Sequence, residues 1–158
     1  MTTITSVDQL KQLVGHELQV SDWHEVTQEE IDLFADAVGD HQWIHVDRER
    51  AKSGPFGATV AHGFWTLATA RTLLRGAAGV QLQLASRMGV NYGLNRVRFP
   101  NPVRVGTRIR ARAKLLAVDE IEPNIVQQVT EITVEIEGET KPAMVAESVT
   151  RTYLEVKV

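Results

Sequence analysis

The sequence predicts an α+β fold in which a curved antiparallel sheet wraps one long helix. Four long segments in the second half alternate apolar and polar residues, as strands with one face in the core do. Residues 62–74 instead predict a helix with apolar or small side chains on every side until Arg71. Such a helix is buried all round. Because 158 residues is the length of one domain, residues 1–158 are expected to form a single unit.

Composition excludes several classes of function. The 17 Lys and Arg residues against 20 Asp and Glu residues leave a net charge of −3, which argues against a nucleic-acid partner. The absence of cysteine excludes disulfides, thiolate catalysis and Cys-ligated zinc. The longest uncharged run, residues 53–70, is too polar and too broken by glycine to span a membrane, and no signal peptide is visible. We expect a cytoplasmic protein without a membrane partner.

The first half contains two helices with recognisable start and stop signals. A capping box at residues 6–9 predicts a short helix that Gly15 ends, and a strand is expected over residues 17–23. A second capping box at residues 27–30 predicts a helix whose apolar stripe is Ile31, Phe34, Ala35 and Val38. Gly39 ends that helix. Residues 40–57 are expected to be a loop with one helical turn after Asp47.

The second half supplies the predicted sheet. Strands are expected over residues 90–99, 108–117, 125–137 and 143–154, in meander order. Within the first of these the apolar side chains change parity between Leu94 and Val97, which predicts a β-bulge or a strand shared between two environments. The alternating basic residues of the second strand, from Arg108 to Lys114, are interpreted as a solvated face of the sheet.

Asp40 and His45 are the strongest candidates for chemistry. Asp40 follows the glycine that ends the second helix, and His45 lies five residues later among apolar neighbours. If the loop folds back, a carboxyl and an imidazole meet and can exchange a proton with one water near neutral pH. The structural alternative is a turn-forming Asp40 and a partly buried His45 whose ring nitrogens are satisfied.

A metal site is a weaker interpretation of the same segment. His41 and His45 have the i, i+4 spacing of ligands on a helix. Trp43, Ile44 and Val46 make a helix there unconvincing, and no third ligand lies at a recognisable offset. We therefore predict no metal.

The start of the long helix is a second candidate. Free backbone N–H groups at a helix N-terminus can stabilise an oxyanion, and Gly63 would let a substrate carbonyl approach closely. The alternative is that Gly63 only permits close packing of helix against sheet. Asn91 and Asn95 flank the parity change, where an amide can either orient a ligand or satisfy a bulge.

Three blocks of sequence, in order, resemble the MaoC-like (R)-specific enoyl-CoA hydratase family. That family's signature is an aromatic residue followed by Gly-Asp-x-Asn-Pro-aliphatic-His, with an Asp two residues beyond the His. It matches residues 34–47, FADAVGDHQWIHVD, except that Gln42-Trp43 replaces Asn-Pro. The second block is Phe56-Gly57 with residues 60–63, VAHG, and the third comprises residues 91–99 and 102–106.

This resemblance implies a hot-dog fold and a homodimer that binds acyl-CoA in a tunnel near the subunit interface. It implies syn addition of water to trans-2-enoyl-CoA, giving (R)-3-hydroxyacyl-CoA reversibly, with no cofactor beyond the CoA thioester itself. By the same resemblance Asp40 and His45 are the catalytic pair and the Gly63 N–H is the oxyanion donor. Substrate contacts are predicted from Val60, Ala61, His62 and Asn95.

Because a fold does not determine a function, other functions remain open at this point. An acyl-CoA thioesterase would also place a carboxylate and a helix N-terminus at a thioester, but it would release free CoA. A subunit of a heteromeric 3-hydroxyacyl-ACP dehydratase would need a second kind of chain. A purely structural interaction domain is the third alternative.

Overall fold

The computed structural model describes residues 2–155 and contains one sheet of eight strands. Its strand order is β1-β4-β2-β6-β7-β8-β5, with β3 beside β6, and every pairing except β1–β4 is antiparallel. The strands are β1 (Thr2–Ile4), β2 (Glu17–Val20), β3 (His24–Glu25), β4 (Ala78–Leu82), β5 (Ser86–Arg98), β6 (Arg108–Glu122), β7 (Ile125–Ile136) and β8 (Met144–Leu154). The predicted α+β fold is confirmed.

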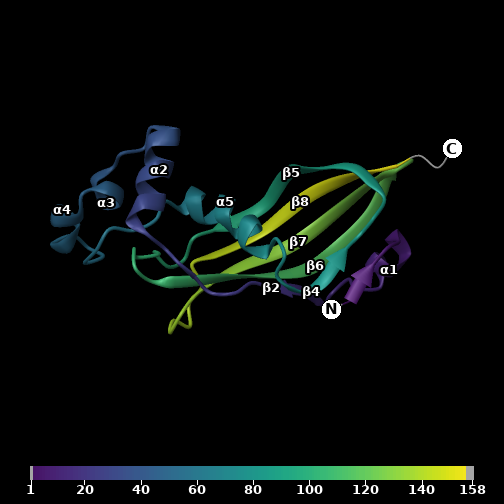
Figure 1. Cartoon of the computed structure of the whole chain (residues 1–158), viewed down its shortest axis with the longest axis horizontal. Helices are drawn as coiled ribbons and strands as arrows, with labels where there is room; N and C mark the ends of the chain where they lie inside the picture. Colours follow the sequence, from purple (N-terminus) through teal and green to yellow (C-terminus); the bar gives the residue numbers. More distant parts are fainter. Residues whose placement is uncertain (1, 156–158) are drawn as a thin grey trace.

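Five helices accompany the sheet in the described part of the chain: α1 (Val7–Lys11), α2 (Gln28–Val38), α3 (Trp43–Val46), α4 (Arg48–Lys52) and α5 (Gly63–Leu74). Figure 1 shows α5 lying against the sheet, with α2, α3 and α4 gathered beyond one end of it. Over residues 2–155, no helix is both long and apolar enough to cross a membrane.

The predicted boundaries of α2 are confirmed by its caps. The Thr27 hydroxyl accepts from the Glu30 amide, and the Glu30 carboxylate accepts from the Thr27 amide. Gly39 ends the helix in the left-handed region at φ 75°, which a glycine adopts without a steric penalty. The capping box at α1 is only half formed, because the Gln9 side chain accepts from the Thr5 amide rather than from Ser6.

The prediction that residues 43–46 are not helical is wrong. They form the short helix α3, closed by a hydrogen bond from the Asp47 amide to the Trp43 carbonyl. Tertiary contacts outweigh the low helix propensity of this segment. The buried Gln28 side chain donates to the His45 carbonyl at 2.7 Å, and the Arg50 guanidinium lies over the Trp43 ring.

Helix α5 is not enclosed on every side within this chain, which corrects the prediction from its composition. Trp65, Ala70 and Leu74 are buried against the sheet, whereas Phe64 is 71% exposed and Ala68 is also exposed. The sheet therefore covers one face of the helix and leaves the opposite face, which includes an apolar ring, uncovered.

The predicted meander holds only for β6, β7 and β8. Strand β5 pairs with β8 and so forms an edge of the sheet, away from the strand that follows it in the chain. Its pairing register shifts between Leu94 and Arg96, which confirms the irregularity predicted from the change of parity. Strands β1 and β4 were not predicted, and the predicted strand over residues 17–23 is shortened to β2, with β3 following after a break.

Candidate active site

The carboxyl of Asp40 is placed by the end of α2. Because Gly39 turns the chain out of the helix, Asp40 begins the connection to α3, and its side chain is 53% exposed. One carboxylate oxygen accepts from the Gln42 amide at 3.3 Å. The other lies 3.9 Å from Nε2 of His62. Asp40 is therefore open to solvent on one side and faces a histidine on the other.

The ring of His45 is buried and held in one orientation. Its Nδ1 lies 2.6 Å from the Val60 carbonyl oxygen, which can only accept, so Nδ1 carries the proton and Nε2 has a free lone pair. Burial lowers the pKa of His45 below its ordinary value, and the neighbouring His62 ring lowers it further. The hydrogen bond to Val60 and the charge of Asp40 act in the opposite direction on that pKa. The balance favours a neutral imidazole able to accept a proton.

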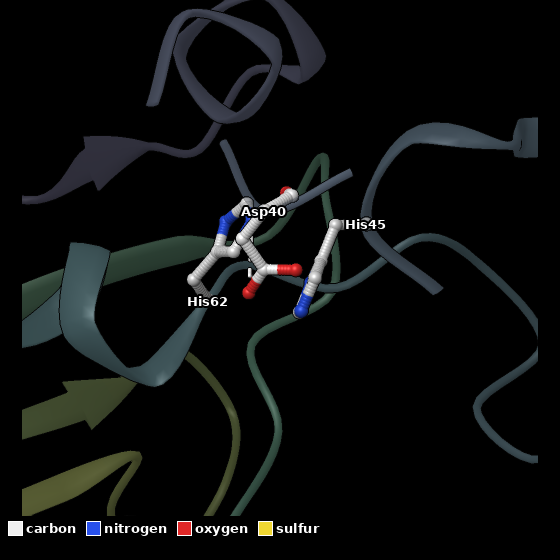
Figure 2. Close-up of side chains that lie close together, drawn as sticks. All are labelled: Asp40, His45 and His62. Atoms are coloured by element: carbon white, nitrogen blue, oxygen red, sulfur yellow. Dashed lines mark hydrogen bonds and ion pairs between the residues drawn. The ribbon is translucent and has the colours of Figure 1, made fainter. Parts of the chain in front are cut away.

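His62 joins the two candidates. It is the residue before α5, is 3% exposed, and stacks on His45 with ring centroids 3.8 Å apart and planes 23° apart. Its Nε2 donates to the Asp40 backbone carbonyl at 3.0 Å, while Nδ1 is buried without a hydrogen-bond partner among the described residues. Figure 2 shows Asp40, His45 and His62 gathered at one place, and one ligand-type atom from each lies within 4.8 Å of the others.

The predicted alternative of a metal on His41 and His45 is not the arrangement found. The His41 ring instead pairs with Asp36 at 2.7 Å on the exposed face of α2. Asp40, His45 and His62 have the residue types of a metal site. However, the lone pair of an imidazole lies in the plane of its ring, and two nearly parallel stacked planes do not converge on a nearby ion. The geometry fits proton exchange better than coordination.

Gly63 begins α5, so its N–H lies among the amides of the first turn, which have no partner within the helix. A Cβ at this position would lie 3.0 Å from the Phe99 ring. The close approach of the Phe99 ring supports the packing interpretation of this glycine, whereas its role as an oxyanion donor stays a prediction.

Of the other residues predicted to contact the substrate, Val60 and Ala61 are buried and Asn95 is exposed. The amides of Val60 and Ala61 bond to the carbonyls of Ile44 and Val103. The segment that leads into α5 is therefore hydrogen-bonded to α3 through Val60 and to the loop before β6 through Ala61. Asn95 lies exposed on β5, at the shift in pairing register.

Sequence reasoning missed one residue that positions the site. Gln28 in the first turn of α2 is buried, donates to the carbonyl of His45, and accepts from the Thr59 hydroxyl at 2.5 Å. The sequence shows only that Gln28 lies at the start of a helix. Its two hydrogen-bond partners, His45 and Thr59, lie 17 and 31 residues further along the chain, so no local pattern indicates them.

Comparison with known proteins places this chain in a family. The model of the MaoC-like domain matches residues 9–137. The 3-hydroxyacyl-thioester dehydratase Z of Mycobacterium tuberculosis strain H37Rv is 51% identical over 151 residues, which cover 96% of this chain and 98% of the relative. The chain belongs to the MaoC-like dehydratase family. The family and this relative show that it is a hydro-lyase.

Two further comparisons are informative. Nodulation protein N of Rhizobium leguminosarum biovar viciae is 45% identical over 138 residues, covering 87% of this chain and 84% of that protein. The structure of an (R)-hydratase from A. caviae involved in PHA biosynthesis superposes with a TM-score of 0.65 at 24% identity. It covers 87% of this chain and 94% of that one, and at this identity it shows the hot-dog fold alone.

Proposed function

We propose that this protein is an (R)-specific enoyl-CoA hydratase, which adds water to trans-2-enoyl-CoA and, in reverse, dehydrates (R)-3-hydroxyacyl-CoA. The observation that carries the proposal is the meeting of the Asp40 carboxyl with the buried His45 beside the first turn of α5. The name of the mycobacterial relative, a dehydratase of 3-hydroxyacyl thioesters, supports the same substrate class.

In the proposed reaction Asp40 and His45 hold one water between them. His45, neutral because its burial lowers its pKa, accepts a proton from this water at Nε2 as the oxygen bonds to C3. Negative charge then develops on the thioester oxygen, where the Gly63 N–H and the N-terminus of α5 stabilise it. The pair returns a proton to C2, so that H and OH are added from one side. This sequence of proton transfers needs no cofactor.

His62 is the positioning residue in this proposal. It holds the Asp40 backbone through its Nε2 donor and holds His45 by stacking, but the reacting atoms do not need to touch it. The hydrogen bond joins the end of α2 to the start of α5, and the stacking joins α3 to it, so Asp40 and His45 are both held beside the start of α5.

The decisive experiment is to incubate the purified protein with crotonyl-CoA and to follow loss of the enoyl absorbance together with release of free thiol. Hydration predicts loss of the enoyl group, an (R)-3-hydroxybutyryl-CoA product by chiral analysis, and no thiol. Thiol release without hydration would support the thioesterase alternative and overturn the proposal. A series of longer CoA and carrier-protein thioesters then defines the acyl group and its carrier.

We also propose that the protein is a homodimer assembled through β5. This edge strand exposes Met88, Tyr92 and Leu94, and the nearby ring of Phe99 lies against the exposed Phe64. Edge strands with exposed apolar side chains pair readily with another strand, and a second copy offers the same edge. Light scattering should give the dimer mass. Tyr92→Lys should give the monomer, whereas the control Leu33→Lys, at an exposed position on α2, should not.

A further inference from the structure

A polar, cationic hollow lies at the opposite end of α5 from the candidate active site. Two adjacent hollows of about 340 Å³ and about 390 Å³ share Arg71, Arg75, Leu82, Gln128 and Thr150 among their lining residues. Figure 1 shows the long strands continuing past the end of α5. The residues that line the hollows come from the end of α5 and from strands that include β4, β7 and β8. Arg71 lies eight residues from Gly63, about 12 Å along the helix.

The floor of the hollow departs from the pattern of the rest of β7. The side chains of β7 that face the helix are apolar at Ile132, Val134 and Ile136, but polar at Gln128 and Thr130. Gln128 is 7% exposed, and the described residues supply no hydrogen bond to its side chain, yet its polar atoms are not fully buried. The amide therefore reaches the hollow, where it can bond to water or to a ligand.

The walls of the hollow carry positive charge without a counter-charge. Neither Arg71 nor Arg75 forms an ion pair with any residue in the range 2–155, and no carboxylate lines either hollow. The one side-chain hydrogen bond of Arg71 in that range is donated to the Ser148 hydroxyl at 3.4 Å. Arg71 and Arg75 are both exposed, although the protein atoms around the Arg71 guanidinium lower its pKa by partial burial.

Two arginines at the end of a helix also complement its partial negative charge, which accounts for their sign. That effect does not account for the inward-facing amide and hydroxyls opposite them. Guanidinium groups, a free amide and hydroxyls around a concavity of this size form a donor-rich site for oxygen anions.

We propose that this hollow binds a small ligand bearing a carboxylate or a phosphate, held by Arg71 and Arg75 over the polar floor at Gln128 and Thr150. The site is separate from Asp40 and His45, and the proposal does not depend on the identity of the reaction catalysed there. It assigns a role to the polar stripe and the unpaired arginines, which the hydration mechanism does not use.

The test is isothermal titration calorimetry of the full chain with pyrophosphate and, separately, with glutarate. At least one probe should bind saturably at millimolar concentration or below, and added salt should weaken it. Arg71→Gln and Arg75→Gln should each lower that affinity by about tenfold or more, since each removes a charge-assisted donor. Arg48→Gln, an equal change of charge at an exposed site on α4, should change it by less than about twofold.

The two probes separate the two anion chemistries, since the tighter one identifies whether phosphate or carboxylate is preferred. Thermal unfolding of each variant checks that the fold is kept. The proposal is overturned if neither probe binds saturably, if both arginine variants bind as the unmodified protein does, or if Arg48→Gln weakens binding equally. Because no thioester is used, a failure here is distinct from a failure of the proposed hydratase activity.

Discussion

The two ends of α5 show how one helix can present two kinds of chemistry. At its N-terminus, stacked buried histidines, one of which precedes the first turn, lie beside an exposed carboxyl, and the core against the sheet is apolar. At its C-terminus, two arginines without an ion pair in residues 2–155 line a hollow together with Gln128 and Thr150. In the proposed mechanism the first end lowers the pKa of a base and stabilises an oxyanion. In the proposed anion site the second end holds an anion, and none of its lining residues can exchange a proton near neutral pH. Burial and the positive end of the helix dipole act at the first end, whereas at the second end the dipole is negative and the arginines must offset it.

The largest expected effect comes from removing the acid–base pair at the N-terminal end. Asp40→Asn and His45→Gln should each lower kcat for crotonyl-CoA hydration by roughly 10²–10⁴-fold, the usual contribution of a positioned general acid or base. Steady-state rates measure this, with Asp36→Asn as the control, because that carboxylate pairs with His41 on the outside of α2. Near-normal turnover in either site variant would remove the basis for the mechanism.

The next effect separates the two roles of Gly63. Gly63→Ala should lower kcat by roughly tenfold to a hundredfold, less than deleting an oxyanion donor, because the amide remains but a methyl crowds it and the Phe99 ring. The same crowding should lower the midpoint of thermal unfolding. Adding Phe99→Leu, which makes room for the methyl group, should restore that midpoint without restoring kcat. Recovery of both quantities would mean that the glycine serves packing only.

Substitution of His62 tests whether positioning couples Asp40 to His45. His62→Phe keeps a stacked ring but loses the donor to the Asp40 carbonyl, and we expect a loss in kcat of roughly tenfold with little change in KM. The imidazole of His62 also lowers the pKa of His45 electrostatically, so its replacement by an uncharged phenyl ring should move the acid limb of the pH–rate profile to higher pH. His62→Gln, which keeps a donor, should recover part of the rate. An unmoved acid limb would reduce His62 to a structural role.

A smaller effect is expected from the pH dependence of the unmodified protein. The pKa of His45 is lowered on folding, so the unfolded chain binds the proton more tightly than the folded chain does. The free energy of unfolding should therefore decrease as the pH falls from about 6.5, the ordinary pKa of histidine, towards the lower pKa of His45 in the folded protein. Urea unfolding across this range should show that slope, and His45→Gln should flatten it. The acid limb of kcat/KM should likewise lie below pH 6.5; a limb at or above that value would contradict the assignment of His45 as base.

The smallest effect concerns the C-terminal end. Gln128→Leu replaces an amide that reaches the hollow by an apolar side chain of similar size, so the free energy of unfolding should change by less than about 1 kcal/mol. The same variant should bind pyrophosphate or glutarate more weakly, which titration calorimetry measures. Unchanged affinity would mean that Gln128 takes no part in the hollow, and the comparison of the two ends would rest on the arginines alone.

Local signals in the sequence determined the elements that carry the site. The capping box at Thr27, the glycine at position 39 and the alternation along β6 to β8 act between neighbours in the chain, so they are legible without a structure. The spacing of Asp40 and His45 likewise identified the pair that the fold brings together, because the intervening turn is short.

Tertiary structure alone decided the remainder. Helix α3 forms where propensity argues against it, because Gln28 and Val60 hold His45 from distant parts of the chain. Strand β5 crosses to the far edge beside β8, and α5 keeps one face uncovered, since a single sheet reaches only one side of it. The stacking of His62 and the hollow at Arg71 also join residues far apart in sequence. The periodicity of apolar residues predicts which face of a helix or strand is buried, but it does not predict which distant segment packs against that face. The side chains that surround both ends of α5 are set by such tertiary contacts.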